Sequence, residues 1–162
     1  MSKEEKKFLQ LIYDNQAILH KICFVYARSH TERKDLEQEI TLQLWKSFST
    51  FKGNSAFSTW MYRVALNTAI SMTKKPGLFF LNDDDNTLYH ELDEQNNMSE
   101  DIKILYKAIH HLKKLDKAII LMWLDEKSYD EISETTGITV KNVSVRIVRI
   151  KSKLSDIIKK IQ

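Results

Sequence analysis

The stretch FKGNSAFSTW, residues 51–60, combines residue types suited to holding a nucleobase outside its stack. Lys52 supplies a cation, and Gly53 supplies a flexible backbone that can approach a ligand closely. Asn54 and Ser55 add small polar groups able to hydrogen-bond a base edge or a phosphate. The composition of this stretch therefore points to contact with single-stranded nucleic acid.

Aromatic rings flank this stretch, and the helix predicted after it carries polar groups on one stripe. Phe51, Phe57 and Trp60 can stack on bases, although packing in a hydrophobic core is an equally open interpretation of these rings. Trp60, Arg63 and Asn67 follow one another at helical spacing. An arginine and an asparagine beside an indole suit a nucleic-acid surface better than a core.

A second candidate site lies near the C-terminus, in SYDEISETTGITVKNV. Ser128 and Glu131 have the spacing of a capping box, which begins a short helix. Gly137 follows that helix and accepts the left-handed backbone conformation that allows a sharp turn. Thr139 can cap the next helix. This succession predicts a helix-turn-helix.

The last helix has an apolar seam and a polar face. The seam repeats at alternating steps of four and three residues: Val143, Ile147, Ile150, Leu154, Ile157 and Ile161. The residues away from the seam near the helix start are Lys141, Asn142, Val145, Arg146 and Arg149. Because the start of the second helix of such a motif enters the major groove, we expect these side chains to read base pairs. A basic solvated helix that forms a coiled coil is the alternative.

A third segment, DLEQEITLQLWKSF, has a pattern that predicts an amphipathic helix over residues 35–48. Its predicted core residues are Leu36, Ile40 and Leu44. The flanks carry Asp35, Gln38, Glu39 and Leu42. A mixed acidic and apolar flank can dock a basic helix of a partner, or it can be an ordinary solvated face.

These segments require a scaffold of helices. The 162 residues include only three glycines and one proline, and no alternating strand pattern occurs. Cys23 is the single cysteine, so an internal disulfide is excluded, and the sequence favours a reducing cytoplasm. No apolar run is long enough to span a bilayer, and the first ten residues lack the apolar core of a signal peptide. We expect an all-α protein that is neither secreted nor inserted in a membrane.

Charge divides the chain into three parts. Residues 1–76 carry 12 basic and 7 acidic side chains, residues 77–101 carry none and 8, and residues 102–162 carry 13 and 7. We therefore expect two small helical domains, 1–76 and 102–162, joined by an acidic linker, 77–101. The linker is either a solvated tether or an acidic strand that docks in a basic channel of a partner.

Together, the three motifs resemble regions 2 and 4 of bacterial sigma-70 family RNA polymerase sigma factors, of the small extracytoplasmic-function type. The resemblance covers residues 8–76 and 102–155, in the expected order. It implies an alternative sigma factor that binds core RNA polymerase, recognises the −35 and −10 promoter elements and melts the DNA. It also implies a cytoplasmic protein without catalysis of its own.

The resemblance assigns residues to each role. The beta-prime clamp helices would be bound by Asp35, Leu36, Gln38, Glu39, Leu42 and Trp45. The −10 element would be captured by Lys52, Gly53, Asn54, Ser55, Phe57, Thr59, Trp60, Arg63 and Asn67. The −35 element would be read by Asn142, Arg146 and Arg149, with Lys141 and Lys151 on phosphates. Val145 occupies a position on the same helix that is more often polar or small in the family, so the element read here would lean on methyl contacts. Further partners implied are the beta flap of polymerase and an anti-sigma factor.

One departure from the family pattern concerns the helix that contains Trp123. The family usually begins this helix after a Leu-Pro pair, whereas here Asp116 follows Leu115. We expect Asp116 to cap the helix instead.

Two rival functions stay open on the sequence alone. One is a polymerase-independent helix-turn-helix regulator, dimeric through the seam of the last helix, and the other is a helical adaptor that binds only protein. An enzyme, a metal site and a cofactor are not expected, because His, Cys and carboxylate residues do not cluster at ligand or triad spacing.

Overall fold

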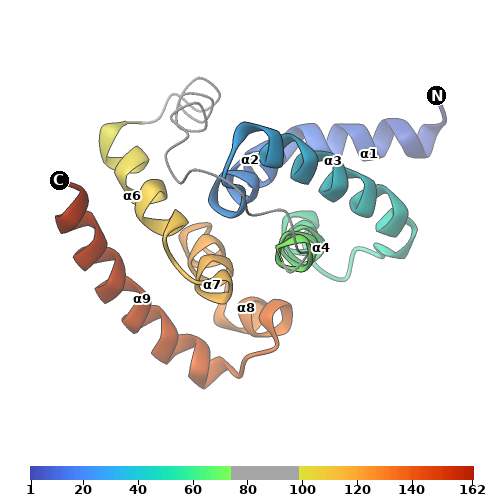
Figure 1. Ribbon diagram of the computed structural model, residues 1–162. Helices are drawn as coiled ribbons and strands as arrows, with labels where there is room; N and C mark the ends of the chain where they lie inside the picture. The colour runs from blue at the N-terminus through green and yellow to red at the C-terminus, as the bar shows by residue number, and fades with distance from the viewer. Residues whose placement is uncertain (74–98) are drawn as a thin grey trace.

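A computed structural model describes residues 1–73 and 99–162, and within these ranges it contains helices and no strand. The first half holds α1 (Lys3–Asp14), α2 (Gln16–Tyr26), α3 (His30–Ser47), the 3-10 turn η1 (Phe48–Thr50) and α4 (Phe57–Met72). The second half holds α6 (Glu100–His110), α7 (Lys114–Leu124), α8 (Tyr129–Thr136) and α9 (Val140–Ile161). The two termini lie at opposite ends of the molecule (Figure 1). The all-helical prediction is confirmed for the described residues.

Helix α2 forms the centre of the molecule. Its second half is apolar and buried on all sides, and Ile22, Cys23 and Val25 are completely buried. Helices α3, α4, α6 and α7 all pack against it. The helical spacing of Phe8, Ile12, Leu19, Ile22 and Tyr26 predicts one amphipathic helix or a pair of helices. The structure shows a pair that breaks at Asn15.

Helices α3 and α4 complete the first half. Leu36, Ile40 and Leu44 are buried as predicted. The sequence predicts that this helix starts near Ser55 to Ser58, where hydroxyls could cap it. Helix α4 does begin there, after Ala56, but no side chain caps it. The hydroxyl of Ser58 instead accepts a hydrogen bond from the ammonium group of Lys127 in the second half. The helix ends at Met72. The sequence predicts its end at Pro76, because a proline ring cannot continue a helix, but Pro76 and most of the predicted linker lie outside the described residues.

The turn between α8 and α9 matches the sequence prediction. Ser128 and Glu131 form a reciprocal capping box. Gly137 has φ +78°, in the left-handed region, and its amide donates to the carbonyl of Ser133 at 2.8 Å. The side chain of Thr139 accepts a hydrogen bond from the amide of Asn142. The predicted helix-turn-helix is therefore present (Figure 1).

Helix α7 begins differently from the prediction. Its N-cap residue is Lys113, so Asp116 lies in the first turn, inside the helix, and does not cap it. Asp116 is buried, and its carboxylate faces α9. A buried carboxylate requires a charged or hydrogen-bonded partner, and α9 provides one.

The two halves of the chain share one hydrophobic core. Phe24 of α2 packs edge-on against Tyr106 of α6, with ring centroids 6.5 Å apart. The hydroxyl of Tyr26 donates to the carbonyl of Lys114 at 2.6 Å, and the ring of His110 hydrogen-bonds the carbonyl of Ala27 at 2.8 Å. The halves are thus packed together in this structure.

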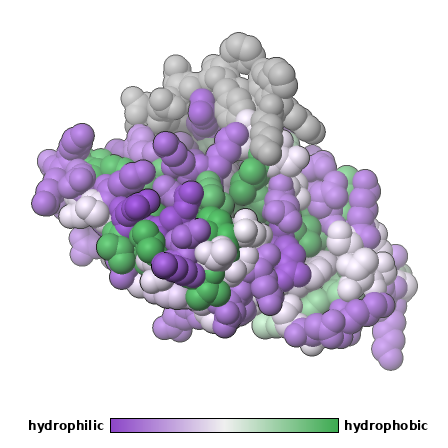
Figure 2. Space-filling view, turned by 90° about the horizontal axis from the view of Figure 1, so that it is seen from below, coloured by the Kyte–Doolittle hydropathy of each residue, from purple (hydrophilic) through white to green (hydrophobic). Residues whose placement is uncertain are grey.

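The face shown in Figure 2 is mostly hydrophilic and carries only small hydrophobic patches.

Replacing Gly137 by Ala should destabilise the protein by about 1 kcal/mol, because a side chain resists the left-handed conformation. No atom lies within 4 Å of an added Cβ, so the cost is conformational and not steric. Gly137→Asn should cost less, since asparagine tolerates this conformation. Urea unfolding followed by circular dichroism measures both, and equal stability of Gly137→Ala and the wild type would contradict the assignment.

Candidate nucleic-acid interface

The loop between η1 and α4 presents the groups that the sequence assigned to the −10 element. Lys52, Gly53, Asn54 and Ser55 are all exposed. Gly53 has φ +76°, in the left-handed region that favours glycine. The loop thus offers a cation, an amide and a hydroxyl to solvent, next to aromatic rings at its base.

Those rings form a packed cluster. The ring centroids of Phe51, Phe57 and Trp60 lie 5.3 to 5.6 Å from one another. The ring of Phe48 packs edge-on against Trp60, with centroids 6.3 Å apart. Trp60 is only 8% exposed, whereas Phe51 and Phe57 remain partly exposed. The buried indole therefore packs beneath Phe51 and Phe57, and these two phenyl rings are the ones on which a base could stack.

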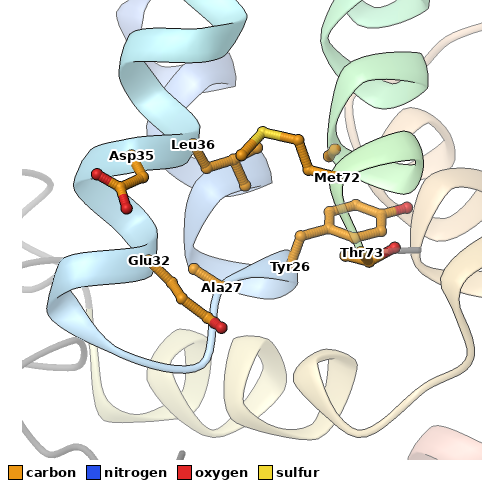
Figure 3. Close-up of a pocket in the computed structure, with 8 residues that line it drawn as sticks. Tyr26, Ala27, Glu32, Asp35, Leu36, Met72 and Thr73 are labelled. Carbon is orange, nitrogen blue, oxygen red and sulfur yellow. The ribbon is translucent and has the colours of Figure 1, made fainter. Parts of the chain in front are cut away.

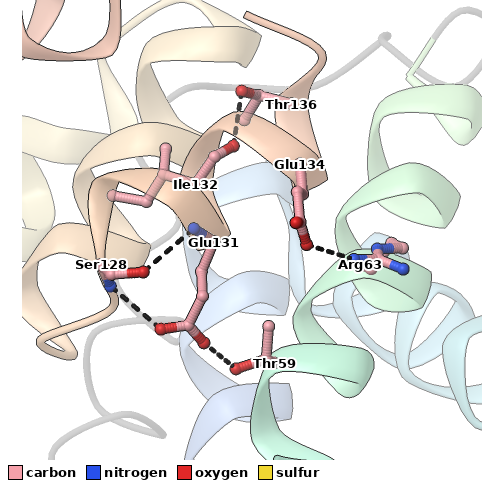
Figure 4. A network of polar contacts seen from close by, with 7 residues as sticks. All are labelled: Thr59, Arg63, Ser128, Glu131, Ile132, Glu134 and Thr136. Atoms are coloured by element: carbon pink, nitrogen blue, oxygen red, sulfur yellow. Dashed lines mark hydrogen bonds and ion pairs between the residues drawn. The ribbon is translucent and has the colours of Figure 1, made fainter. Parts of the chain in front are cut away.

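The first turns of α4 are covered by α8 of the second half. The hydroxyl of Thr59, which is 1% exposed, donates to the carboxylate of Glu131. Arg63 pairs with Glu134 at 3.5 Å. Figure 4 shows both acidic side chains reaching from one face of α8 toward α4. Two residues assigned to the −10 element are thus engaged within the chain.

Glu131 combines two structural roles. One of its carboxylate oxygens accepts from the amide of Ser128, which begins α8, and the other accepts from Thr59 (Figure 4). The Thr59 hydrogen bond is the largest cause that lowers the pKa of Glu131, and partial burial opposes it. The same side chain therefore starts the helix-turn-helix and holds it against α4.

The outer face of α4 continues away from this contact. Asn67 is exposed and lines a polar hollow together with Ser71, Glu39 and Gln43. Gln43 donates to Glu39 at 2.9 Å, which fixes one wall. Asn67 is therefore accessible to a nucleic acid, whereas Thr59 is buried and Arg63, although its side chain is 42% exposed, is paired with Glu134.

Helix α9 divides as the sequence predicted. Its seam residues Val143, Ile147, Ile150 and Leu154 are buried against the rest of the second half, and Ile157 and Ile161 are partly buried. The opposite face is exposed and includes Lys141, Asn142, Val145, Arg149 and Lys151. Val148 joins this face with 68% exposure. The exposed face is thus both basic and apolar.

Two residues of the predicted −35 set have partners inside the protein. Arg146 forms an ion pair with the buried carboxylate of Asp116 at 3.2 Å, and Lys153 lies 3.8 Å from the same carboxylate. The ammonium group of Lys151 lies 4.1 Å from the centroid of the Trp123 ring, a cation–π distance. Arg146 and Lys151 thus help to fix α9 on α7. Asp116 could not be found from the sequence, because it lies 30 positions from Arg146.

The predicted polymerase-binding set lies mainly on the exposed side of α3. Asp35 and Gln38 are exposed, and Leu42 and Trp45 are 44% and 39% exposed. Leu36, in contrast, is buried and faces Met72 across a small pocket (Figure 3). Glu39 is half-buried. Leu36 therefore supports this surface from within.

The exposed part of α3 borders an open groove of about 760 Å³ against α1. Trp45 packs on Phe8 at the base of this groove, with ring centroids 5.1 Å apart. Gln38, Leu42 and Leu9 line its walls. Sequence reasoning missed that α1 forms one wall of this groove. The signal was Leu9, because an exposed apolar side chain on the polar side of a helix can indicate a contact surface.

Within the described ranges, no group of three or more His, Cys, Asp or Glu side chains is placed to hold a metal ion. A search of the same ranges found no helix with the length and apolar character that a membrane crossing requires.

Comparison with known proteins matches both halves of the chain to regions of one protein family. Residues 11–76 match the family model of Sigma-70 region 2, and residues 102–154 match that of Sigma-70, region 4. The ECF RNA polymerase sigma-E factor of Haemophilus influenzae is 32% identical over 142 residues, covering 79% of this chain and 75% of that protein. The sigma-E factor of Escherichia coli K12 is 28% identical over 169 residues, covering 94% and 87%.

Solved structures agree with this match at the level of the fold. The sigma factor RpoE of Bartonella quintana, in complex with the anti-sigma factor NepR, superposes with a TM-score of 0.72 at 19% identity, covering 95% of this chain and 98% of that one. CnrH in complex with the cytosolic domain of CnrY gives a TM-score of 0.69 at 20% identity, covering 98% and 91%.

Replacing Thr59 by Val should raise the pKa of Glu131 toward its ordinary value, because the largest cause of its depression is removed. In the wild type, the depressed pKa contributes stability above the ordinary pKa of glutamate, and this contribution is lost as the pH falls through the lowered value. Carbon-13 NMR titration of the Glu131 carboxyl measures the shift. An identical titration in both proteins would contradict the α4–α8 contact in solution.

Proposed function

This chain belongs to the extracytoplasmic-function group of the sigma-70 family of RNA polymerase sigma factors, and from that premise we propose how its surfaces divide the work. It is an alternative sigma factor that directs promoter-specific initiation of transcription by RNA polymerase. The polymerase supplies the chemistry of RNA synthesis, and this chain acts with it in the cytoplasm as a recognition subunit.

The α1–α3 groove is the surface for the beta-prime clamp helices of polymerase. Leu42 and Trp45 offer exposed apolar contact area, and Gln38 and Asp35 add polar and acidic groups beside them. A pair of amphipathic helices with basic flanks fits a groove of this character. The second half would contact the beta flap.

The loop of residues 52–55 captures an unstacked base of the −10 element. Phe57 stacks on that base, while Trp60 holds the phenyl ring in place from below. Thr59 and Arg63 take part only after α8 has moved away, because their polar groups face Glu131 and Glu134 in the present structure. Binding to polymerase separates the two halves and releases this surface.

The exposed face of α9 reads the −35 element in the major groove. Arg149 and Asn142 would bond base edges and Lys141 would contact a phosphate, and all three side chains are exposed. Val145 and Val148 add methyl contacts, which favour thymine. Arg146 is held by Asp116, so its first role is to orient α9, and any DNA contact it makes comes from that fixed position.

The burial of the α9 seam weighs against the rival of a dimeric regulator. Val143, Ile147, Ile150 and Leu154 pack within the chain and are at most 6% exposed, so no apolar seam is left for a second copy. A protein-only adaptor would leave the exposed loop cation and the basic face of α9 without a role.

We also propose that an anti-sigma factor holds this protein inactive. The support is the likeness in fold to two sigma factors that were solved in complexes, one with the anti-sigma factor NepR and one with the cytosolic domain of CnrY. Such a partner would act on the same two halves that must separate in transcription.

The observation that carries the proposal is the presence, in one chain and in family order, of an exposed −10 loop and an exposed basic recognition helix. Run-off transcription with core polymerase tests it. The protein should produce defined transcripts from genomic fragments that core polymerase alone does not produce. Absence of any protein-dependent transcript, with binding to core polymerase intact, would contradict the proposal.

Arg149→Ala should weaken recognition of the −35 element by about 1–3 kcal/mol, since a bidentate contact to a base is lost. Lys159→Ala, which removes a cation at the far end of the same helix, is the matched control and should leave recognition unchanged. Footprinting of the holoenzyme on promoters with intact and scrambled −35 elements measures the effect. Equal protection by Arg149→Ala and Lys159→Ala would show that the reading face is misplaced.

A further inference from the structure

Asp116, in the first turn of α7, is the only carboxylate that is buried among residues 1–73 and 99–162. Burial removes the water that would solvate a carboxylate, so the group requires partners of opposite charge. Those partners come from α9. The guanidinium group of Arg146 donates to one carboxylate oxygen at 3.2 Å, and the ammonium group of Lys153 lies 3.8 Å from the other. Both oxygens of Asp116 thus face the recognition helix.

The apolar seam of α9 already holds this helix against the second half of the chain. Val143, Ile147, Ile150 and Leu154 are at most 6% exposed. Apolar contacts are non-directional, so they favour close packing over any one rotation of the helix about its axis. A charge-assisted hydrogen bond is directional. Because buried ion pairs often add little stability beyond an apolar pair of the same size, stability alone does not account for Asp116.

Arg146 and Lys153 belong to the flank of α9 that carries the proposed base-reading side chains. Asn142, Arg146, Arg149 and Lys153 follow one another at steps of four, three and four residues, which places them along one stripe of a helix. Within this stripe, Asn142 and Arg149 are exposed, whereas Arg146 is partly buried and paired with Asp116. The carboxylate therefore holds α9 at a point between the two side chains that would contact base edges.

A second contact from α7 acts on the other flank of the seam. The ammonium group of Lys151 lies 4.1 Å from the centroid of the Trp123 ring. Lys151 is five residues from Arg146, which corresponds to about 140° around an α-helix, so the two side chains reach α7 from different sides of the seam. Asp116 and Trp123 are seven residues apart and share one face of α7. Contacts on both flanks fix the rotation of α9.

We propose that Asp116 is a positioning residue for recognition of the −35 element, holding α9 at the rotation in which Asn142 and Arg149 face the base edges. This step rests on the proposed function, in which the exposed face of α9 enters the major groove. Bidentate contacts to a base require well-aligned hydrogen bonds. A helix that turns about its axis therefore loses base discrimination before it loses general affinity for DNA, which depends on phosphate charge.

Asp116→Asn tests the proposal, because it removes the charge and keeps the shape of the side chain. Holoenzyme binding is measured on a promoter recovered in the run-off assay and on copies with single-base substitutions in the −35 element. For the wild type, a substitution at a recognised base pair should weaken binding about tenfold or more, and for Asp116→Asn about threefold or less. Binding to a promoter with a fully scrambled −35 element should be the same for both proteins.

Asp156→Asn is the matched control, because it makes the same chemical change at an exposed aspartate of α9 beyond the reading face. It should discriminate between promoters like the wild type. Circular dichroism and urea unfolding show whether each variant is folded. Reduced stability of Asp116→Asn with unchanged discrimination would make its role purely structural and overturn the proposal. Equal weakening on intact and scrambled −35 elements would overturn it as well.

The connection through Arg146 has a separate test. If Asp116 acts through Arg146, the double variant Asp116→Asn with Arg146→Ala should discriminate about as well as Arg146→Ala alone, because the two changes remove one interaction. Losses that add in the double variant would contradict this connection.

Residual dipolar couplings of the free protein measure the orientation of α9 relative to α7 without polymerase or DNA. Asp116→Asn should shift the couplings of α9 relative to those of α7, and Asp156→Asn should not. Unchanged couplings in Asp116→Asn would overturn the positioning role even where promoter recognition stands. Shifted couplings, together with a wild-type holoenzyme that ignores the −35 element, would remove the proposed function and leave Asp116 as the residue that sets α9.

Discussion

The contact between α8 and the start of α4 is the constraint on which the function of this protein depends. Thr59 and Arg63 on α4 face the carboxylates of Glu131 and Glu134 on α8. Under the proposed function, the two carboxylates would compete with phosphates of the DNA strand for this hydroxyl and this guanidinium. Helix α8 therefore covers part of the surface that we propose for the −10 element, so under the proposed function it must leave α4 before that surface can bind DNA.

Apolar packing holds the two halves of the chain together, whereas polar contacts fix the position of α8 on α4. The Arg63–Glu134 pair is largely exposed, so its contribution to stability is small, about 0–1 kcal/mol. The apolar contacts of α2 with α6 and α7 bury far more surface and hold the halves together. The polar groups instead fix where α8 lies on α4. A large protein partner such as polymerase can replace such an interface with one of its own.

Sequence reasoning captured what depends on local pattern. Gly137, the Ser128 capping box and the apolar seam of α9 all follow from spacing within one or two helical turns, and the structure confirms them. The partners of Thr59 and Arg146 could not be predicted, because they lie 72 and 30 positions away. The burial of Trp60 was left open by its pattern, since an indole suits a core and a base stack equally. The roles of the site residues in binding DNA and polymerase stay predictions.

The central claim is that α8 covers the start of α4 in the free protein and leaves it when polymerase binds. The most direct measurement is the distance between two spin labels in one variant that carries both Ser55→Cys and Asp130→Cys. Pulsed electron paramagnetic resonance gives this distance with and without core polymerase. Cys23, the single native cysteine, is completely buried and will not compete for the label. The account predicts one short distance in the free protein and a longer one in the complex. The same distance in both states, in a complex that initiates transcription, would contradict it.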